Sequence, residues 1–178
     1  MTLNHRFHAT VFALFCVFAS ACSRPVGDTN KNGSPAAGEP TPVTSTGVVK
    51  ATPEELTLNK GEPGTVIVRL QIQNGYHVNA NPPSFPYLIA TQLELAGAKN
   101  VLIGAITYPD PVTRKFSFAD APLKVYEGEA IIKAVINTHQ AAEAGKHNLS
   151  AKLRVQACDD NVCYPPGTID LVVPVTIK

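Results

Sequence analysis

Alternation of apolar and polar residues with a period of two is the feature that most restricts the fold of this sequence. In the segment Thr65–Gln73, every second residue from Val66 to Ile72 is Val, Leu or Ile. Such alternation is typical of a half-buried β-strand. No stretch of about ten residues or more carries the 3.6-residue apolar stripe of an amphipathic helix. The sequence therefore predicts an all-β protein.

Further segments have strand character and are separated by turn signals. The other predicted strands are Tyr76–Asn79, Leu88–Leu95, Asn100–Tyr108, Val125–Asn137 with a bend at Gly128, Leu149–Ala157 and Thr168–Ile177. Many short strands of this kind predict an immunoglobulin-like antiparallel β-sandwich, with a closed barrel as the main alternative.

Gly, Pro and Asn mark the connections between these strands. Asn74-Gly75 predicts a tight turn, and the three prolines of Asn81–Pro86 exclude that segment from a central strand. Residues 109–122 are predicted to be a long connection. Pro174 indicates that the last strand lies at an edge or contains a bulge.

The first 47 residues lack the alternating pattern and divide into two parts. Residues 1–21 carry Arg6 and then an uncharged run from Ala9 to Ala21, which is shorter than the about 20 residues that span a bilayer and has the size of a secretory signal peptide. Residues 22–47 are rich in Pro, Gly, Ser, Thr and Asn, which predicts a disordered linker. Residues 48–178 form the predicted β-sandwich domain.

Cys22 directly follows Ala19-Ser20-Ala21, small residues that suit signal peptidase and also resemble a bacterial lipobox. Of the four cysteines, Cys16 would leave with the signal peptide, and an odd thiol would remain in an oxidising compartment. Lipidation of Cys22 would leave one pair. The sequence therefore favours an exported protein that faces the periplasm and is anchored by lipid to a bacterial membrane, with simple secretion as the alternative.

The composition argues against several classes of function. The chain has 15 Lys and Arg against 14 Asp and Glu, so its charge gives no reason to expect a nucleic-acid partner. With five His, one Met and no cluster at metal-ligand spacing, no metal site is expected. No Gly-rich phosphate loop is present, and no cofactor is expected. Metal handling by reduced thiols together with a histidine is a weaker alternative.

Cys158 and Cys163 enclose the turn-forming segment Asp159–Val162. If both flanks are strands, the cysteines oppose each other in a hairpin, where Cα atoms lie roughly 4.5–5.5 Å apart and a disulfide can form. A ring this short stabilises by only about 2 kcal/mol, against about 3 for a fifteen-residue loop. The residues leave two hypotheses open: a structural disulfide, or a redox-active pair that exchanges with a partner.

The acidic residues in this loop argue against a self-activated thiol. Asp159 and Asp160 should disfavour a thiolate, whereas reactive cysteines usually lie near Lys, Arg, His or a helix N-terminus. A redox-active pair would therefore depend on a docking partner for activation.

The pair with Tyr164-Pro165-Pro166, together with Gly75–Asn79 and Val125–Gly128, resembles the N-terminal periplasmic domain of the thiol:disulfide interchange protein DsbD. The resemblance covers about Val48–Lys178. It implies an immunoglobulin-like fold and a protein-disulfide reductase or interchange activity. Electrons would come from a thioredoxin-like domain, fed by a membrane electron transporter of the DsbD or CcdA type, and would pass to oxidised periplasmic proteins. It also implies that Cys163 forms the mixed disulfide and that Cys158 resolves it.

The same resemblance implies an aromatic cap over the thiols. The connection before Tyr126 matches the cap loop in position, so Phe118 is the expected cap and Phe116 the second choice. Tyr164 borders the dithiol and could also shield it. Ordinary strand-end packing remains the alternative for Phe116 and Phe118, and common loop framing before Pro-Pro remains the alternative for Tyr164. His77 is expected to be an ordinary, satisfied strand histidine.

DsbD itself continues into a transmembrane electron channel and a C-terminal thioredoxin-like domain, whereas this chain ends at Lys178. The expectation is a stand-alone relay module served by partners in trans. The alternative is a non-enzymatic β-sandwich lipoprotein for binding or assembly, in which the disulfide is structural.

Overall fold

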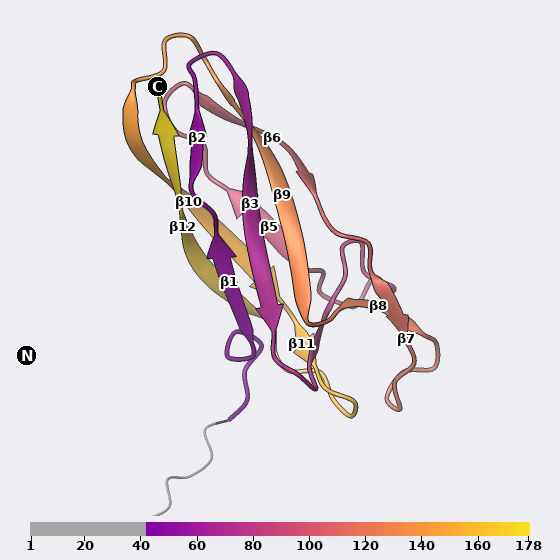
Figure 1. Cartoon of the computed structure of the whole chain (residues 1–178). Helices are drawn as coiled ribbons and strands as arrows, with labels where there is room; N and C mark the ends of the chain where they lie inside the picture. The colour runs from indigo at the N-terminus through magenta and orange to yellow at the C-terminus, as the bar shows by residue number, and fades with distance from the viewer. Residues whose placement is uncertain (1–41) are drawn as a thin grey trace, which may run out of the picture. The chain divides into compact units, whose positions relative to one another are not determined.

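The computed structural model of the chain describes residues 42–178 (Figure 1). All regular structure in this range is β-strand, which confirms the all-β prediction. No helix that could cross a membrane occurs among these residues. The predicted signal peptide, Cys22 and most of the predicted linker lie outside the described residues.

The strands form three four-stranded sheets. The first has the order β1 (Val49–Pro53), β3 (Pro63–Ile72), β9 (Glu129–Thr138) and β6 (Val101–Thr107). The second has the order β2 (Leu56–Leu58), β12 (Gly167–Ile177), β10 (Gly145–Val155) and β5 (Gln92–Leu95). The third has the order β11 (Ala157–Cys158), β4 (His77–Asn79), β8 (Leu123–Tyr126) and β7 (Val112–Arg114). Each sheet has two edge strands, so the alternative of a closed barrel is wrong.

The first two sheets share one apolar core and form the predicted immunoglobulin-like sandwich. All strand pairs are antiparallel except β2 with β12, which is parallel. Nine inward residues of the long strands are 0% exposed: Val66, Val68, Leu70, Ile132, Ala134, Ile136, Leu153, Val155 and Val173. Because burial of each Val, Leu or Ile stabilises by about 1.5–3 kcal/mol, these long strands are the rigid frame of the domain.

The third sheet extends the sandwich at one end and carries the cysteines. Three of its strands are continuous with long strands: β4 follows β3 after the Asn74-Gly75 turn, β11 follows β10 after Gln156, and β8 precedes β9 (Figure 1). The short strands of the third sheet are thus held in place by strands that are anchored in the core.

The predicted strand Val125–Asn137 is two strands in two different sheets. The chain leaves the third sheet after β8 and enters the first at β9, and Gly128 between them has a φ of 60°. This left-handed conformation favours glycine.

Three smaller expectations also differ from the structure. Only Gln92–Leu95 of the predicted strand Leu88–Leu95 is a strand, and β7 lies within the predicted connection 109–122. The last strand, β12, is central rather than an edge strand. However, β2 pairs only with the last three residues of β12, from Val175 to Ile177. Pro174 lies just outside that stretch, where the side of β12 is open and a missing N–H is tolerated.

Candidate functional site

A disulfide joins Cys158 and Cys163 at the end of the third sheet. The two residues form an antiparallel bridge, with hydrogen bonds from Tyr164 N to Ala157 O of 2.8 Å and from Asp159 N to Val162 O of 3.0 Å. This confirms the predicted hairpin with opposed cysteines. Their Cα atoms are 3.9 Å apart, closer than the roughly 4.5–5.5 Å expected for residues of an ordinary antiparallel pair.

Asp159 organises the loop between the cysteines. Its Oδ1 accepts hydrogen bonds from the N–H groups of Asn161 at 2.8 Å and Val162 at 2.9 Å. Its Oδ2 accepts one from the hydroxyl of Tyr164 at 2.6 Å, across the hairpin. The hydroxyl bond and the two N–H bonds lower the pKa of Asp159, and the carboxylate raises the pKa of Tyr164 to about 12. The carboxylate thus holds the loop closed.

The hydrogen bond between Asp159 and Tyr164 stabilises the hairpin only within a defined pH range. The pKa of Asp159 is lowered, so its contribution to stability is present above its unfolded value and is lost as pH falls through the folded value. The pKa of Tyr164 is raised from 10.0, so its contribution is present below 10.0 and is lost as pH rises through about 12.

In Asp159→Asn, the pKa of Tyr164 is expected to fall from about 12 towards 10.0, because the charged acceptor is removed while Oδ1 can still bind the loop amides. Ultraviolet absorbance of tyrosinate as a function of pH measures this pKa. The difference from Tyr164→Phe isolates this residue among the five tyrosines. An unchanged titration in Asp159→Asn would show that the carboxylate does not control the hydroxyl.

The two cysteines differ in exposure. Cys158 is 0% exposed because β11 is covered on one side by β4 and on the other by the returning chain. Cys163 is only partly buried. A reagent or partner thiol approaching from solvent therefore reaches Cys163 first.

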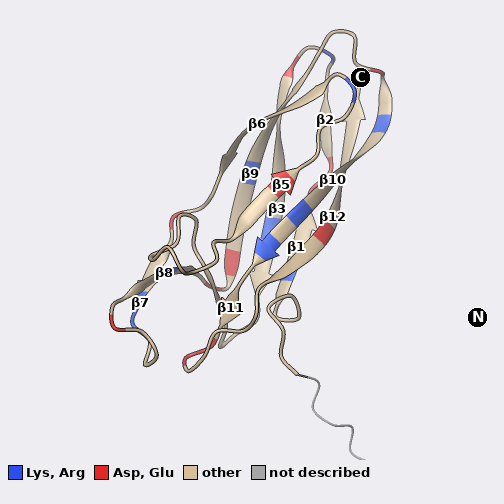
Figure 2. Cartoon of the chain, turned by 180° about the vertical axis from the view of Figure 1, so that it is seen from behind, with Lys and Arg blue, Asp and Glu red and all other residues tan. Residues whose placement is uncertain are grey.

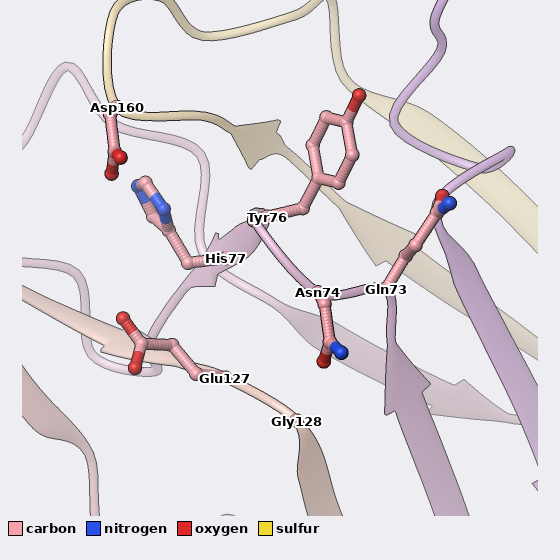
Figure 3. Close-up of a pocket in the computed structure, with 8 residues that line it drawn as sticks. Gln73, Asn74, Tyr76, His77, Glu127, Gly128 and Asp160 are labelled. Atoms are coloured by element: carbon pink, nitrogen blue, oxygen red, sulfur yellow. The ribbon is translucent and has the colours of Figure 1, made fainter.

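His77 lies directly opposite Cys158 in the pairing of β4 with β11. It is 3% exposed, its ring stacks on Phe116 with a centroid distance of 4.0 Å, and its Nε2 has no hydrogen-bond partner. The expectation of a satisfied strand histidine is wrong for this nitrogen. His77 also lines an open pocket of about 340 Å³ with Tyr76, Glu127 and Asp160 (Figure 3).

The segment between β7 and β8 lies against the cysteine hairpin. Ser117 Oγ donates a hydrogen bond to Asp160 O at 2.9 Å. Phe116 is buried on His77, whereas Phe118 is 37% exposed and stacks on Phe116 with a centroid distance of 5.4 Å. The structure thus brings both expected cap residues to this end of the molecule, with Phe116 beneath and Phe118 outside. The cap role itself stays a prediction.

Two structural supports of the hairpin were not expected from the sequence. Ser45, in the predicted linker, is 1% exposed, and its Oγ accepts a hydrogen bond from Ala157 N and donates one to Pro165 O. The packed part of the chain therefore begins before Val48. Asp159 was expected only to disfavour a thiolate. Neither the hydrogen bonds of Ser45 nor the loop-closing bonds of Asp159 have a local signal in the sequence, because Ser and Asp are common in any loop.

The charges around the site are of mixed sign. Figure 2 shows acidic residues in the loop beside β11, and basic and acidic residues interspersed along the strands. Glu127, which lies nearby, is paired with Arg114 at 2.8 Å. The acidic groups of the hairpin itself are Asp159 and Asp160. Among residues 42–178, no cluster of three His, Cys, Asp or Glu side chains could hold a metal.

Comparison with known proteins gives one family match. Residues 47–173 match the family described as thiol:disulfide interchange protein DsbD, N-terminal. The reduced DsbD N-terminal domain of Neisseria meningitidis is 20% identical, with a TM-score of 0.41 over 62% of this chain and 77% of that chain. The N-terminal periplasmic domain of ScsB from Proteus mirabilis is 15% identical, with a TM-score of 0.46 over 70% of this chain and 44% of that chain. No curated protein sequence matches significantly.

Proposed function

The chain belongs to the family of DsbD N-terminal domains, which relay reducing equivalents through a cysteine pair, and on that premise we propose that it is a periplasmic thiol–disulfide relay. Electrons enter the Cys158/Cys163 pair from a thioredoxin-like domain, which a membrane electron transporter of the DsbD or CcdA type supplies. They leave to oxidised exported proteins.

The observation that carries this proposal is the unequal exposure of one disulfide. A structural staple needs no accessible sulfur, whereas exchange needs one cysteine that a partner reaches and a second that is protected. Cys163 is partly exposed and Cys158 is fully buried. This supports Cys163 as the residue that forms mixed disulfides and Cys158 as the residue that resolves them.

Each half of the cycle conserves atoms and electrons. A partner thiolate attacks Sγ of Cys163, a partner–Cys163 disulfide forms, the Cys158–Cys163 bond breaks, and Cys158 leaves as a thiolate that takes up a proton. A second partner thiol then attacks the mixed disulfide, so the partner is oxidised and both cysteines are reduced. In the forward half, Cys163 attacks an oxidised substrate, Cys158 closes the internal disulfide, and the substrate leaves with two electrons.

The surroundings of Cys163 favour activation of this cysteine by the partner rather than by the domain. The carboxylates of Asp159 and Asp160 oppose negative charge on a nearby sulfur. The segment with Ser117 and Phe118 lies against the same loop. A docking partner therefore has to displace or contact this segment and supply either its own thiolate or an environment that favours the thiolate of Cys163.

The location proposed for this relay follows from the N-terminal sequence. Cys22 after Ala19-Ser20-Ala21 fits a lipidated cysteine, and the residues between Cys22 and the packed Ser45 would form the leash between membrane and domain. Labelling with palmitate that is lost in Cys22→Ala tests this part, and labelling that persists in that variant would reject it.

The redox potential separates the relay from the alternative of a binding lipoprotein with a structural disulfide. For the relay we expect a value nearer to about −200 mV, as in exchange proteins, than to the values below about −300 mV of structural disulfides. Equilibration of the purified domain with glutathione or dithiothreitol buffers, followed by alkylation of free thiols, measures it. A potential well below about −300 mV would reject the relay.

A further inference from the structure

One row of side chains crosses the third sheet through the disulfide. Cys163 opposes Cys158, and Cys158 opposes His77. The register of β4 with β8, in which Val78 opposes Tyr126, places Glu127 next in the same row. Directly opposed residues of antiparallel strands project to one face, with Cβ atoms roughly 4.5–5.5 Å apart. The row therefore places His77 and the buried Cys158 as neighbours on one face of the sheet.

The imidazole in this row has an unused hydrogen-bonding atom. Nε2 of His77 is buried and unpartnered in the oxidised protein, where Cys158 carries no proton to share. A buried polar atom of this kind costs free energy, so an unpartnered one requires an explanation. Stacking on Phe116 fixes the plane of the ring. Reduction of the disulfide would provide the missing partner as the S–H of Cys158.

We propose that His77 is the proton acceptor for Cys158 when this buried thiol closes the internal disulfide, an inference that rests on the proposed relay. In that step the sulfur of Cys158 attacks Sγ of Cys163 in the mixed disulfide. The Cys158–Cys163 bond forms, the bond from Cys163 to the substrate breaks, and the substrate sulfur leaves with the electron pair. The proton of Cys158 passes to His77 and then to the leaving sulfur or to water in the adjoining pocket.

The groups around His77 suit a base that is neutral before the step and charged after it. Burial lowers the pKa of His77 from 6.5, although Glu127, Asp160 and Asp159 act in the opposite direction. The ring is therefore neutral at pH 7 and free to accept a proton. Figure 3 shows the ring between the side chains of Glu127 and Asp160, whose negative charges would stabilise the imidazolium once formed. Arg114, bound to Glu127, partly offsets the first of these.

The test measures directly how fast Cys158 closes the internal disulfide. The domain is reduced with dithiothreitol, freed of it and mixed with excess oxidised glutathione, and the decay of the Cys163–glutathione adduct is followed by acid quenching and mass spectrometry from pH 5 to 9. The wild-type rate is expected to level off above the pKa of His77. In His77→Gln it should instead rise about tenfold per pH unit with the fraction of Cys158 thiolate. At pH 7 the variant is expected to be on the order of 10²-fold slower.

Two controls separate this role from a structural one. His147→Gln makes the same change on β10, and its profile should match the wild type. His77→Phe keeps an aromatic ring against Phe116, so it serves as the second variant if His77→Gln does not fold, and its rate should also rise with pH. A profile of unchanged shape in the His77 variants would overturn the inference, whatever their absolute rate. Because glutathione replaces the partner, this result is independent of the redox potential that tests the relay.

Discussion

Cys158→Ala is expected to accumulate a stable mixed disulfide with a thioredoxin-like protein that keeps only one active-site cysteine, activated as its thionitrobenzoate disulfide, whereas Cys163→Ala accumulates almost none. In the first variant, the partly exposed Cys163 can attack, and no internal thiol remains to release the adduct. In the second, the only thiol of the pair is the 0% exposed Cys158. Because Cys158 is reached only after local opening of the hairpin, we expect initial trapping rates that differ by at least about tenfold, which corresponds to about 1.4 kcal/mol in activation free energy. Non-reducing electrophoresis, with and without dithiothreitol, measures the adduct.

The two variants are matched controls for each other, because each removes the same disulfide and the same loop constraint. Any loss of stability from the missing bond is therefore common to both. The double variant gives the background of the assay. Equal trapping by the two single variants would contradict the assignment of Cys163 as the attacking residue, and trapping through Cys158 alone would reverse it.

The fold was predictable to the extent that it depends on local alternation. Long strands such as β3 and β10 bury every second residue, so their pattern is visible in the sequence. Whether a predicted strand is divided between two sheets is not decided by the local sequence. The buried positions change phase between β8, with Leu123 and Val125, and β9, with Ala130 and Ile132, but only pairing with distant strands shows that the two belong to different sheets.

The apolar segment before Gln92 shows how tertiary contacts override a local pattern. Ile89 N donates a hydrogen bond to Gln156 Oε1 across 67 residues, and Ile89 O accepts one from Asn79 Nδ2. These side chains take the place of a strand partner, so the segment remains a loop. Such pairings depend on which strands become neighbours in the third sheet, which the local sequence does not specify.

The site was predictable where the geometry of a disulfide restricts the spacing of two cysteines. It was less predictable where it depends on contacts between distant segments. Two cysteines around a turn-forming loop indicate a hairpin, and the structure has it. The unpartnered nitrogen of His77 could not be expected from the sequence, because it depends on the pairing of β4 with β11 and on Phe116 from another segment.

Ser45→Ala is expected to destabilise the domain by about 1–3 kcal/mol, the cost of leaving a buried backbone group without its hydrogen-bond partner. Ser45 Oγ accepts from Ala157 N at 3.0 Å and donates to Pro165 O at 2.7 Å, so one hydroxyl joins the two sides of the cysteine hairpin. Ala157 is 0% exposed, and water cannot replace the lost acceptor without a rearrangement. Urea unfolding followed by circular dichroism measures the change.

Ser150→Ala is the matched control, because it makes the same substitution at an exposed position of β10 and should change the free energy of unfolding by less than about 0.5 kcal/mol. A Ser45 variant no less stable than this control would show that the segment before Val48 does not support the hairpin. If the expected loss is found, the end of the predicted linker supports the cysteine hairpin. The chain that would lead from a membrane anchor then contacts, through Ser45, the strand residue directly before Cys158.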